Sequence, residues 1–129
     1  MEKSSMTKKK FINQWLRHFA RGLSKKDFET YVQDQYIWHV FSFPLLEYSN
    51  LLTGDAAREA FDEVDKSGCI CCDMFGTEGV SCMTASDSVT AAEIDSHYKE
   101  YYVVASDDSW TYIRTHEDGL CGPYFLKLK

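Results

Sequence analysis

The sequence lacks any apolar run close to the roughly 18 residues that a membrane-spanning helix needs. It also lacks the two glycine-rich phosphate-binding patterns, G-x-x-x-x-G-K-[ST] and G-x-G-x-x-G. An H-E-x-x-H zinc motif is missing too, because His116-Glu117 has no second histidine at the required spacing. We therefore predict no membrane span, no cofactor and no metal site.

A secretion signal is not visible, because the basic N-terminus is not followed by an apolar segment with a small-residue cleavage site. The five cysteines are an odd number, which suits reduced thiols better than a disulfide framework. We therefore expect a cytoplasmic protein with reduced cysteines.

Acidic residues are nearly absent from the first 26 positions, where eight lysines and arginines accompany a single acid, Glu2. The whole chain has 14 basic and 20 acidic residues, which leaves six and nineteen for the remainder. This basic head either docks on the acidic body of the same molecule or binds an anionic partner, with Lys8, Lys9 and Lys10 as candidate binding residues. The acidic body would repel phosphates, which argues against duplex nucleic acid as the partner.

The N-terminal third has a helical pattern. Phe11, Trp15 and Phe19 recur every four residues between Thr7 and Gly22, and this spacing predicts an amphipathic helix whose apolar stripe faces the core. Ser24 with Asp27 three residues later indicates the start of a second, short helix.

The segment Tyr36–Phe43 is rich in aromatic and β-branched residues and stops at Pro44, so we predict a strand. Trp38 and His39 would then point to opposite faces. His39 is either a ligand or base, or a packed core histidine with one hydrogen bond.

The rest of the chain alternates short strands with two short helices. The predicted elements are a helix from Thr53 to about Asp65, a hairpin of 69–75 with 80–85, a helix capped by Ser88 or Thr90, and strands at 100–105, 110–116 and 124–128. With 129 residues, 44% of them hydrophobic, we expect one α+β domain covering 1–129. Its sheet is predicted to be mostly antiparallel, with about five or six strands and the helices packed on one face.

The C-terminal ribbon is the densest part of the sequence in aromatic and ionisable residues. Trp110, Tyr112, Arg114 and His116 occupy alternate positions and would share one face of a strand. A polar corner from His116 to Cys121 then leads into the last strand.

Two groups of side chains in the sequence could carry chemistry. Cys121 beside His116 would be the minimum for nucleophilic catalysis, with Glu117 or His39 in support, although no cysteine-protease signature surrounds Cys121. The same corner could equally be solvated and structural. The other group consists of Cys69, Cys71, Cys72 and Cys82, whose C-x-C-C spacing fits core packing better than a zinc site or a redox site.

Three motifs resemble one family. W-H-V-F-S at Trp38–Ser42, Y-V-V at Tyr102–Val104 and the block Trp110–Phe125 are similar to the short bacterial and phage proteins grouped as domain of unknown function 4275. The resemblance covers nearly the whole chain and implies a compact single domain in a firmicute or phage setting. The cysteine-rich stretch departs from the plainer apolar strand expected there. The family brings no established activity, so no catalytic role transfers to His116 or Cys121.

The function that we expect is that of a small non-enzymatic accessory protein that docks on another macromolecule, and we expect this partner to be a protein. Small size, charge asymmetry and the many aromatic residues, which interfaces favour, support this expectation. One alternative is a small hydrolase or transferase using Cys121 and His116. Another is a small-ligand sensor whose pocket is lined by Trp38, Trp110, Tyr112 and Arg114.

Overall fold

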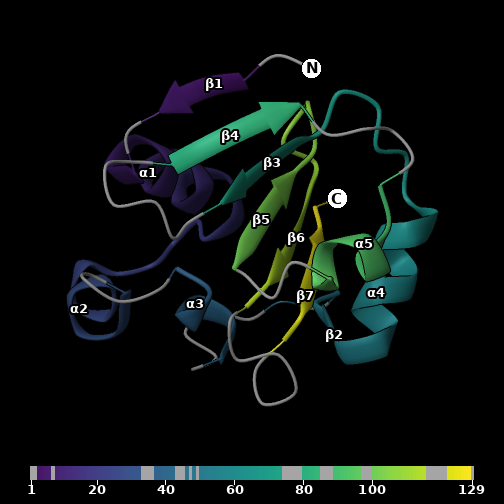
Figure 1. The fold of residues 1–129 in the computed structure, drawn as a ribbon. Helices are drawn as coiled ribbons and strands as arrows, with labels where there is room; N and C mark the ends of the chain where they lie inside the picture. Colours follow the sequence, from purple (N-terminus) through teal and green to yellow (C-terminus); the bar gives the residue numbers. More distant parts are fainter. Residues whose placement is uncertain are drawn as a thin grey trace.

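A computed structural model of the chain describes residues 3–6, 8–32, 37–42, 46, 48, 50–73, 80–84, 89–96, 100–115 and 122–128. Of residues 3–6, 8, 9, 42, 73 and 80–84 it describes the backbone alone. The described strands form one antiparallel sheet in the order β1-β4-β3-β5-β6-β7-β2 (Figure 1). The strands are β1 (Lys3–Met6), β2 (Leu52–Thr53), β3 (Ile70–Asp73), β4 (Val80–Thr84), β5 (Tyr101–Val104), β6 (Trp110–Arg114) and β7 (Tyr124–Lys127).

The helical elements are grouped mainly before and between the hairpins of this antiparallel sheet, so the predicted α+β class is confirmed. They are α1 (Lys8–Phe19), α2 (Lys25–Asp27), the π-helical turn η1 (Phe28–Val32), α3 (His39–Ser42), α4 (Gly54–Glu63) and α5 (Ala91–Asp95). The sheet has the five strands β3 to β7 that the sequence predicted in this region, and the short edge strands β1 and β2 extend it to seven. Two caps are as predicted: Ser24 accepts from the Asp27 amide, and Thr90 accepts from the Glu93 amide.

The predicted strand at 36–43 is wrong. Ile37 and Trp38 form a turn, and His39–Ser42 form a single helical turn, α3. Ile37, Trp38, Val40 and Phe41 are all buried, so this apolar run is enclosed on more than one side. A run without clear alternation does not distinguish a buried strand from a buried helical turn.

Helices cover both faces of the sheet, so the expected one-sided packing is also wrong. Alternate residues of the central strands belong to two separate cores: Tyr102 and Ile113 pack in the core beneath α1, whereas Val103 and Tyr112 pack in the core beneath α4 and α5. Figure 1 shows α1 on one side of the sheet and α4 with α5 on the other. Because the central strands are apolar on both faces, each face needs a cover.

The core beneath α1 contains the aromatic stripe that the sequence predicted. Phe11, Trp15 and Phe19 are at most 5% exposed. The Trp15 indole Nε1–H donates to Thr111 Oγ1 at 3.1 Å, so its one polar group is satisfied inside the core. The helix therefore docks on the sheet in a fixed orientation, which sets the surroundings of both cavities described below.

The core beneath α4 centres on Phe61, which stacks on Tyr112 at 4.3 Å between ring centroids with 15° between the planes. Lys66 closes the C-terminal end of this helix. Its Nζ donates to the carbonyl oxygens of Phe61, Asp62 and Val64 at 2.7, 3.0 and 3.3 Å. The ammonium thus satisfies carbonyls that have no partner within the helix.

Tyr48 links the segment before β2 to the end of α1, because its hydroxyl donates to the Phe19 carbonyl oxygen at 2.7 Å. Burial raises the pKa of Tyr48 to about 12 from its ordinary value of 10.0. A raised folded-state pKa stabilises the fold below the unfolded-state pKa, and this contribution is lost as pH rises from about 10 towards 12.

We therefore expect Tyr48→Phe to be less stable than the wild type by about 1 kcal/mol near neutral pH, where it lacks the hydrogen bond. The difference should close as pH rises through the alkaline range. Urea denaturation of both proteins along a pH series measures it. A difference that stays constant up to the highest pH would contradict the raised pKa.

Candidate functional site

Helix α1 lies between two hollows on opposite sides. The first is an open groove of about 730 Å³ between the C-terminal half of α1 and the α2–η1 segment. We call it the basic groove, and its lining residues are Asn13, Leu16, Arg17, Ala20, Arg21, Gly22, Leu23, Ser24, Lys25 and Phe28. Leu16, Leu23 and Phe28 are partly buried and give the groove an apolar base.

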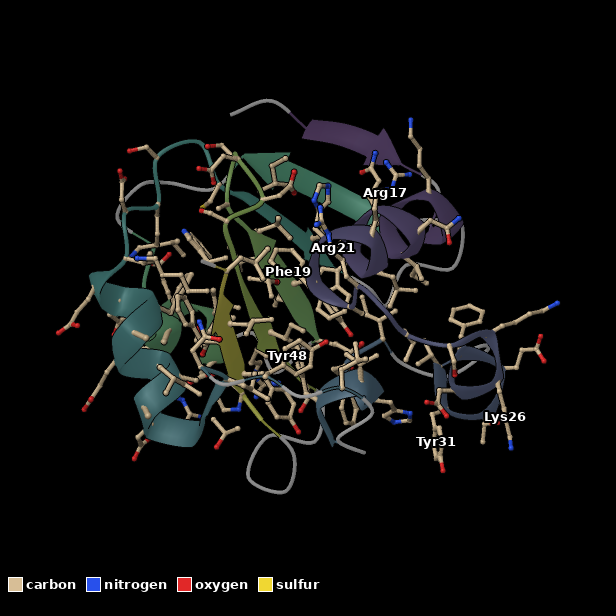
Figure 2. All side chains as sticks on the ribbon, turned by 180° about the vertical axis from the view of Figure 1, so that it is seen from behind. Arg17, Phe19, Arg21, Lys26, Tyr31 and Tyr48 are labelled. Carbon is tan, nitrogen blue, oxygen red and sulfur yellow. The ribbon has the colours of Figure 1, made fainter. Side chains whose placement is uncertain are left out.

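Three cations line this groove, and all three are exposed. Arg21 Nε donates to the Arg17 carbonyl oxygen at 3.3 Å, which directs the Arg21 side chain back along α1. The Lys25 ammonium lies 3.9 Å from Glu29, but its side chain is 90% exposed, so this ion pair holds it only weakly. Figure 2 shows Arg17 on α1, Arg21 just after the C-terminal end of this helix, and Lys26 on α2 beyond them.

Among the described residues, the exposed cations of the basic head make few contacts with acidic side chains. In the described part of the chain Arg17, Arg21 and Lys26 form no ion pair, and the only one that Lys25 forms is with the neighbouring Glu29. Lys10 is also exposed, whereas the side chains of Lys8 and Lys9 lie outside the described residues. The described part of the head therefore presents exposed positive charge at Arg17, Arg21, Lys25 and Lys26.

The second hollow, which we call the apolar pocket, is a cavity of about 200 Å³ between the other side of α1 and the sheet. Its lining residues are Phe11, Gln14, Trp15, Phe19, Ile70, Cys72, Val104, Ala105, Ser106 and Asp108. The sequence did not indicate it, because its walls come from three separate segments. The only local signal was the Asp107-Asp108 turn, which reads as an ordinary loop.

The aromatic binding residues predicted from the sequence are buried in the cores. Trp38, Trp110, Tyr112 and Arg114 are at most 5% exposed. Trp38 belongs to the core beneath α1, whereas Trp110 and Tyr112 belong to the one beneath α4, so the four side chains do not line one pocket. The predicted shared face of Trp110 and Tyr112 is confirmed. Arg114 is held by Asp95 at 3.4 Å between Nε and Oδ1.

Of the catalytic candidates, only His39 lies among the residues that the structure describes. His39 Nδ1 lies 2.7 Å from the Tyr31 carbonyl oxygen, and its ring contacts that of Trp38 edge-on at 4.6 Å. These contacts are typical of a packed histidine, which was one of the two roles that the sequence left open for His39. His116, Glu117 and Cys121 lie outside the described residues, so the catalytic pair stays a prediction.

The cysteines are not all reduced, which corrects the expectation from their odd number. Cys72 is disulfide-bonded, whereas Cys69 and Cys71 are not in a disulfide. The strand register places Cys82 of β4 directly opposite Cys72 of β3. As expected for a strand, Cys69 and Cys71 pack with one core and Cys72 with the other. Among the described residues no group of three or more histidine, cysteine or acidic side chains could hold a metal ion.

The profile of a domain of unknown function, DUF4275, matches residues 2–125, which is nearly the whole chain. The chain belongs to the DUF4275 family. No curated protein and no solved structure matches the sequence of this DUF4275 chain. None of its described helices is long and apolar enough to cross a membrane. The basic groove and the apolar pocket are therefore the features on which a function for this DUF4275 chain can be argued.

Proposed function

We propose that this DUF4275 chain is a non-enzymatic bacterial or phage binding protein that docks on an acidic segment of another protein. The basic groove supports this proposal more than any other feature. Arg17, Arg21 and Lys25 surround a base of partly buried apolar side chains, which is the arrangement that suits a peptide carrying both carboxylates and an apolar residue.

A protein partner fits the charge distribution better than duplex nucleic acid does. The net charge of the chain is −6, so a long polyanion would be repelled by most of the surface. A short acidic segment needs only the local positive potential of the groove. A cytoplasmic location stays a prediction, and the disulfide of Cys72 is unusual for that compartment.

The test compares two triple charge reversals on the basic head. Arg17→Glu/Arg21→Glu/Lys25→Glu reverses the groove, and Lys8→Glu/Lys9→Glu/Lys10→Glu reverses the same number of charges at the other end of α1. Tagged wild type and both variants are used to isolate partners from bacterial lysates, with and without phage infection. The affinity for the partner identified with the wild type is then measured as a function of salt concentration.

We expect the groove reversal to weaken binding roughly 100-fold or more, because like charges then face each other across the interface. The N-terminal reversal should have a much smaller effect, and the wild-type affinity should fall as salt rises. Circular dichroism and urea denaturation show whether the variants are folded. If both folded variants bind like the wild type, the basic head is not the docking surface.

A further inference from the structure

The apolar pocket is separated from the basic groove by the body of α1. Phe11, Trp15 and Phe19 project from one side of the helix, and Ile70 and Val104 come from β3 and β5 of the sheet. An engineered apolar cavity of about 150 Å³ is known to hold benzene. At about 200 Å³, this pocket has room for one aromatic ring with a short chain attached.

Ile70 is an exposed apolar residue at this pocket. It is 40% exposed, and only Leu52 and Ile70 are exposed large hydrophobic residues in the described part of the chain. Ile70 sits in β3 with Val104 of β5 directly beside it in the register, and both line the pocket. Covering Ile70 with an apolar ligand would remove this surface from water, which favours binding.

The polar side of the pocket is acidic and held in place by its turn. Asp108 has a left-handed backbone conformation with φ of 58°, and its amide donates to the Ala105 carbonyl oxygen at 3.0 Å. Its carboxylate lies 3.5 Å from His18 Nε2 and is 43% exposed. The neighbouring Asp107 accepts hydrogen bonds from Ser109, which lower the pKa of Asp107 and hold a second carboxylate in the same turn.

We propose that the apolar pocket binds a small amine with an apolar body, whose ring or short chain fills the cavity while its ammonium group pairs with Asp108. The apolar walls of the pocket would contact the apolar body of the ligand, and the Asp108 carboxylate would bind its ammonium group. An ammonium group here would share Asp108 with His18, whose Nε2 lies 3.5 Å from the carboxylate. The basic groove lies on the other side of α1 and shares no lining residue with the pocket, so this proposal does not rest on the proposed docking in the groove.

Three probes with the same phenyl body and different heads test this assignment: 2-phenylethylamine, 2-phenylethanol and phenylacetate. Each is titrated into the full chain by calorimetry and by amide NMR, with the Trp15 indole and the Ser106 and Asp108 amides as reporters. For molecules of this size we expect a dissociation constant on the order of 1 mM for the amine. The alcohol should bind about threefold or more weakly and the carboxylate more weakly still.

Two variants separate the head from the body of the ligand. Asp108→Asn keeps a residue that tolerates the left-handed conformation, so the turn is retained while the charge is lost. It should bring the amine down to the affinity of the alcohol. Ile70→Ser, by contrast, should weaken all three probes by a similar factor. The proposal fails if no probe shifts the three reporters, if phenylacetate binds best, or if Asp108→Asn leaves the preference for the amine unchanged.

Discussion

Trp38→Phe is expected to lower the free energy of unfolding by about 3 kcal/mol, because it removes a close hydrogen-bond donor from a buried carboxylate. The Trp38 indole Nε1–H donates to Glu100 Oε1 at 2.8 Å, and the two residues are 1% and 2% exposed. Phenylalanine keeps most of the apolar volume of the side chain but has no N–H group. Most of the loss should therefore come from the carboxylate rather than from the smaller ring.

Trp15→Phe is the matched control for this prediction. Trp15 is equally buried, at 2% exposed, and lies in the same core, but its indole donates to the neutral hydroxyl of Thr111. Removing a donor from a neutral acceptor should cost about 1–2 kcal/mol. The difference between the two variants isolates the effect of the charge.

Glu100→Gln completes a double-mutant cycle with Trp38→Phe. The Tyr102 hydroxyl also lies 3.5 Å from Glu100 Oε2, so the carboxylate keeps part of its surroundings in every variant. We expect a coupling free energy of about 1 kcal/mol or more between Trp38 and Glu100 by urea denaturation. Additive losses, or equal losses for Trp38→Phe and Trp15→Phe, would show that the Glu100 charge is not stabilised by this indole.

The elements that the sequence predicted best are those in which the hydrophobic period is unambiguous. The spacing of Phe11, Trp15 and Phe19 places all three on one side of a helix. The alternate positions of Trp110 and Tyr112 place both on one face of a strand. Local chemistry placed the cap at Ser24 as well. In these elements the hydrophobic pattern of the sequence and the tertiary packing favour the same secondary structure.

The wrong predictions have a common physical cause. In each case the secondary structure or the packing depends on tertiary contacts rather than on the local sequence. Residues 37–41 are buried nearly throughout, so their sequence carries no period to read. The strand β1 has the sequence Lys-Ser-Ser-Met and shows no strand signal of its own; it is stabilised by pairing with β4. Both faces of β5 and β6 are buried, so the sheet is a central layer covered on both sides, whereas helices were expected on one face only.

Both hollows beside α1 were beyond prediction for the same reason. The basic residues of the head were visible in the sequence, but Arg17, Arg21 and Lys25 form one groove only because the chain turns after Gly22, whose φ is 88°. The apolar pocket joins Trp15 to Asp108 across more than half of the chain. The sequence therefore indicated the positive charge of the basic groove but not the shape of the groove.

Phe61→Ala is expected to lower the free energy of unfolding by about 3–5 kcal/mol, the usual cost of deleting a buried phenyl ring. Phe61 is fully buried, stacks on Tyr112 and contacts Trp110 edge-on at 5.8 Å between centroids. The Lys66 ammonium also lies 5.0 Å from the centre of the ring. Removal of the ring therefore leaves a cavity and takes away a cation–π contact at the end of α4.

Phe61→Leu is the conservative variant, which fills most of the cavity but has no aromatic face. We expect it to lose clearly less stability than Phe61→Ala in urea denaturation, and to stay folded if the alanine variant does not. Equal losses for leucine and alanine would mean that the aromatic contacts, rather than the filled volume, stabilise this core.

The leucine variant also separates stability from function. Phe61 packs on the face of the sheet opposite to α1, so its replacement leaves every residue of the basic groove in place. A folded Phe61→Leu protein should therefore bind the docking partner with wild-type affinity. The groove reversal should lose binding while staying folded, because its three substituted residues are exposed. This opposite pattern in the two variants distinguishes a docking surface on α1 from a partner that merely requires a stable fold.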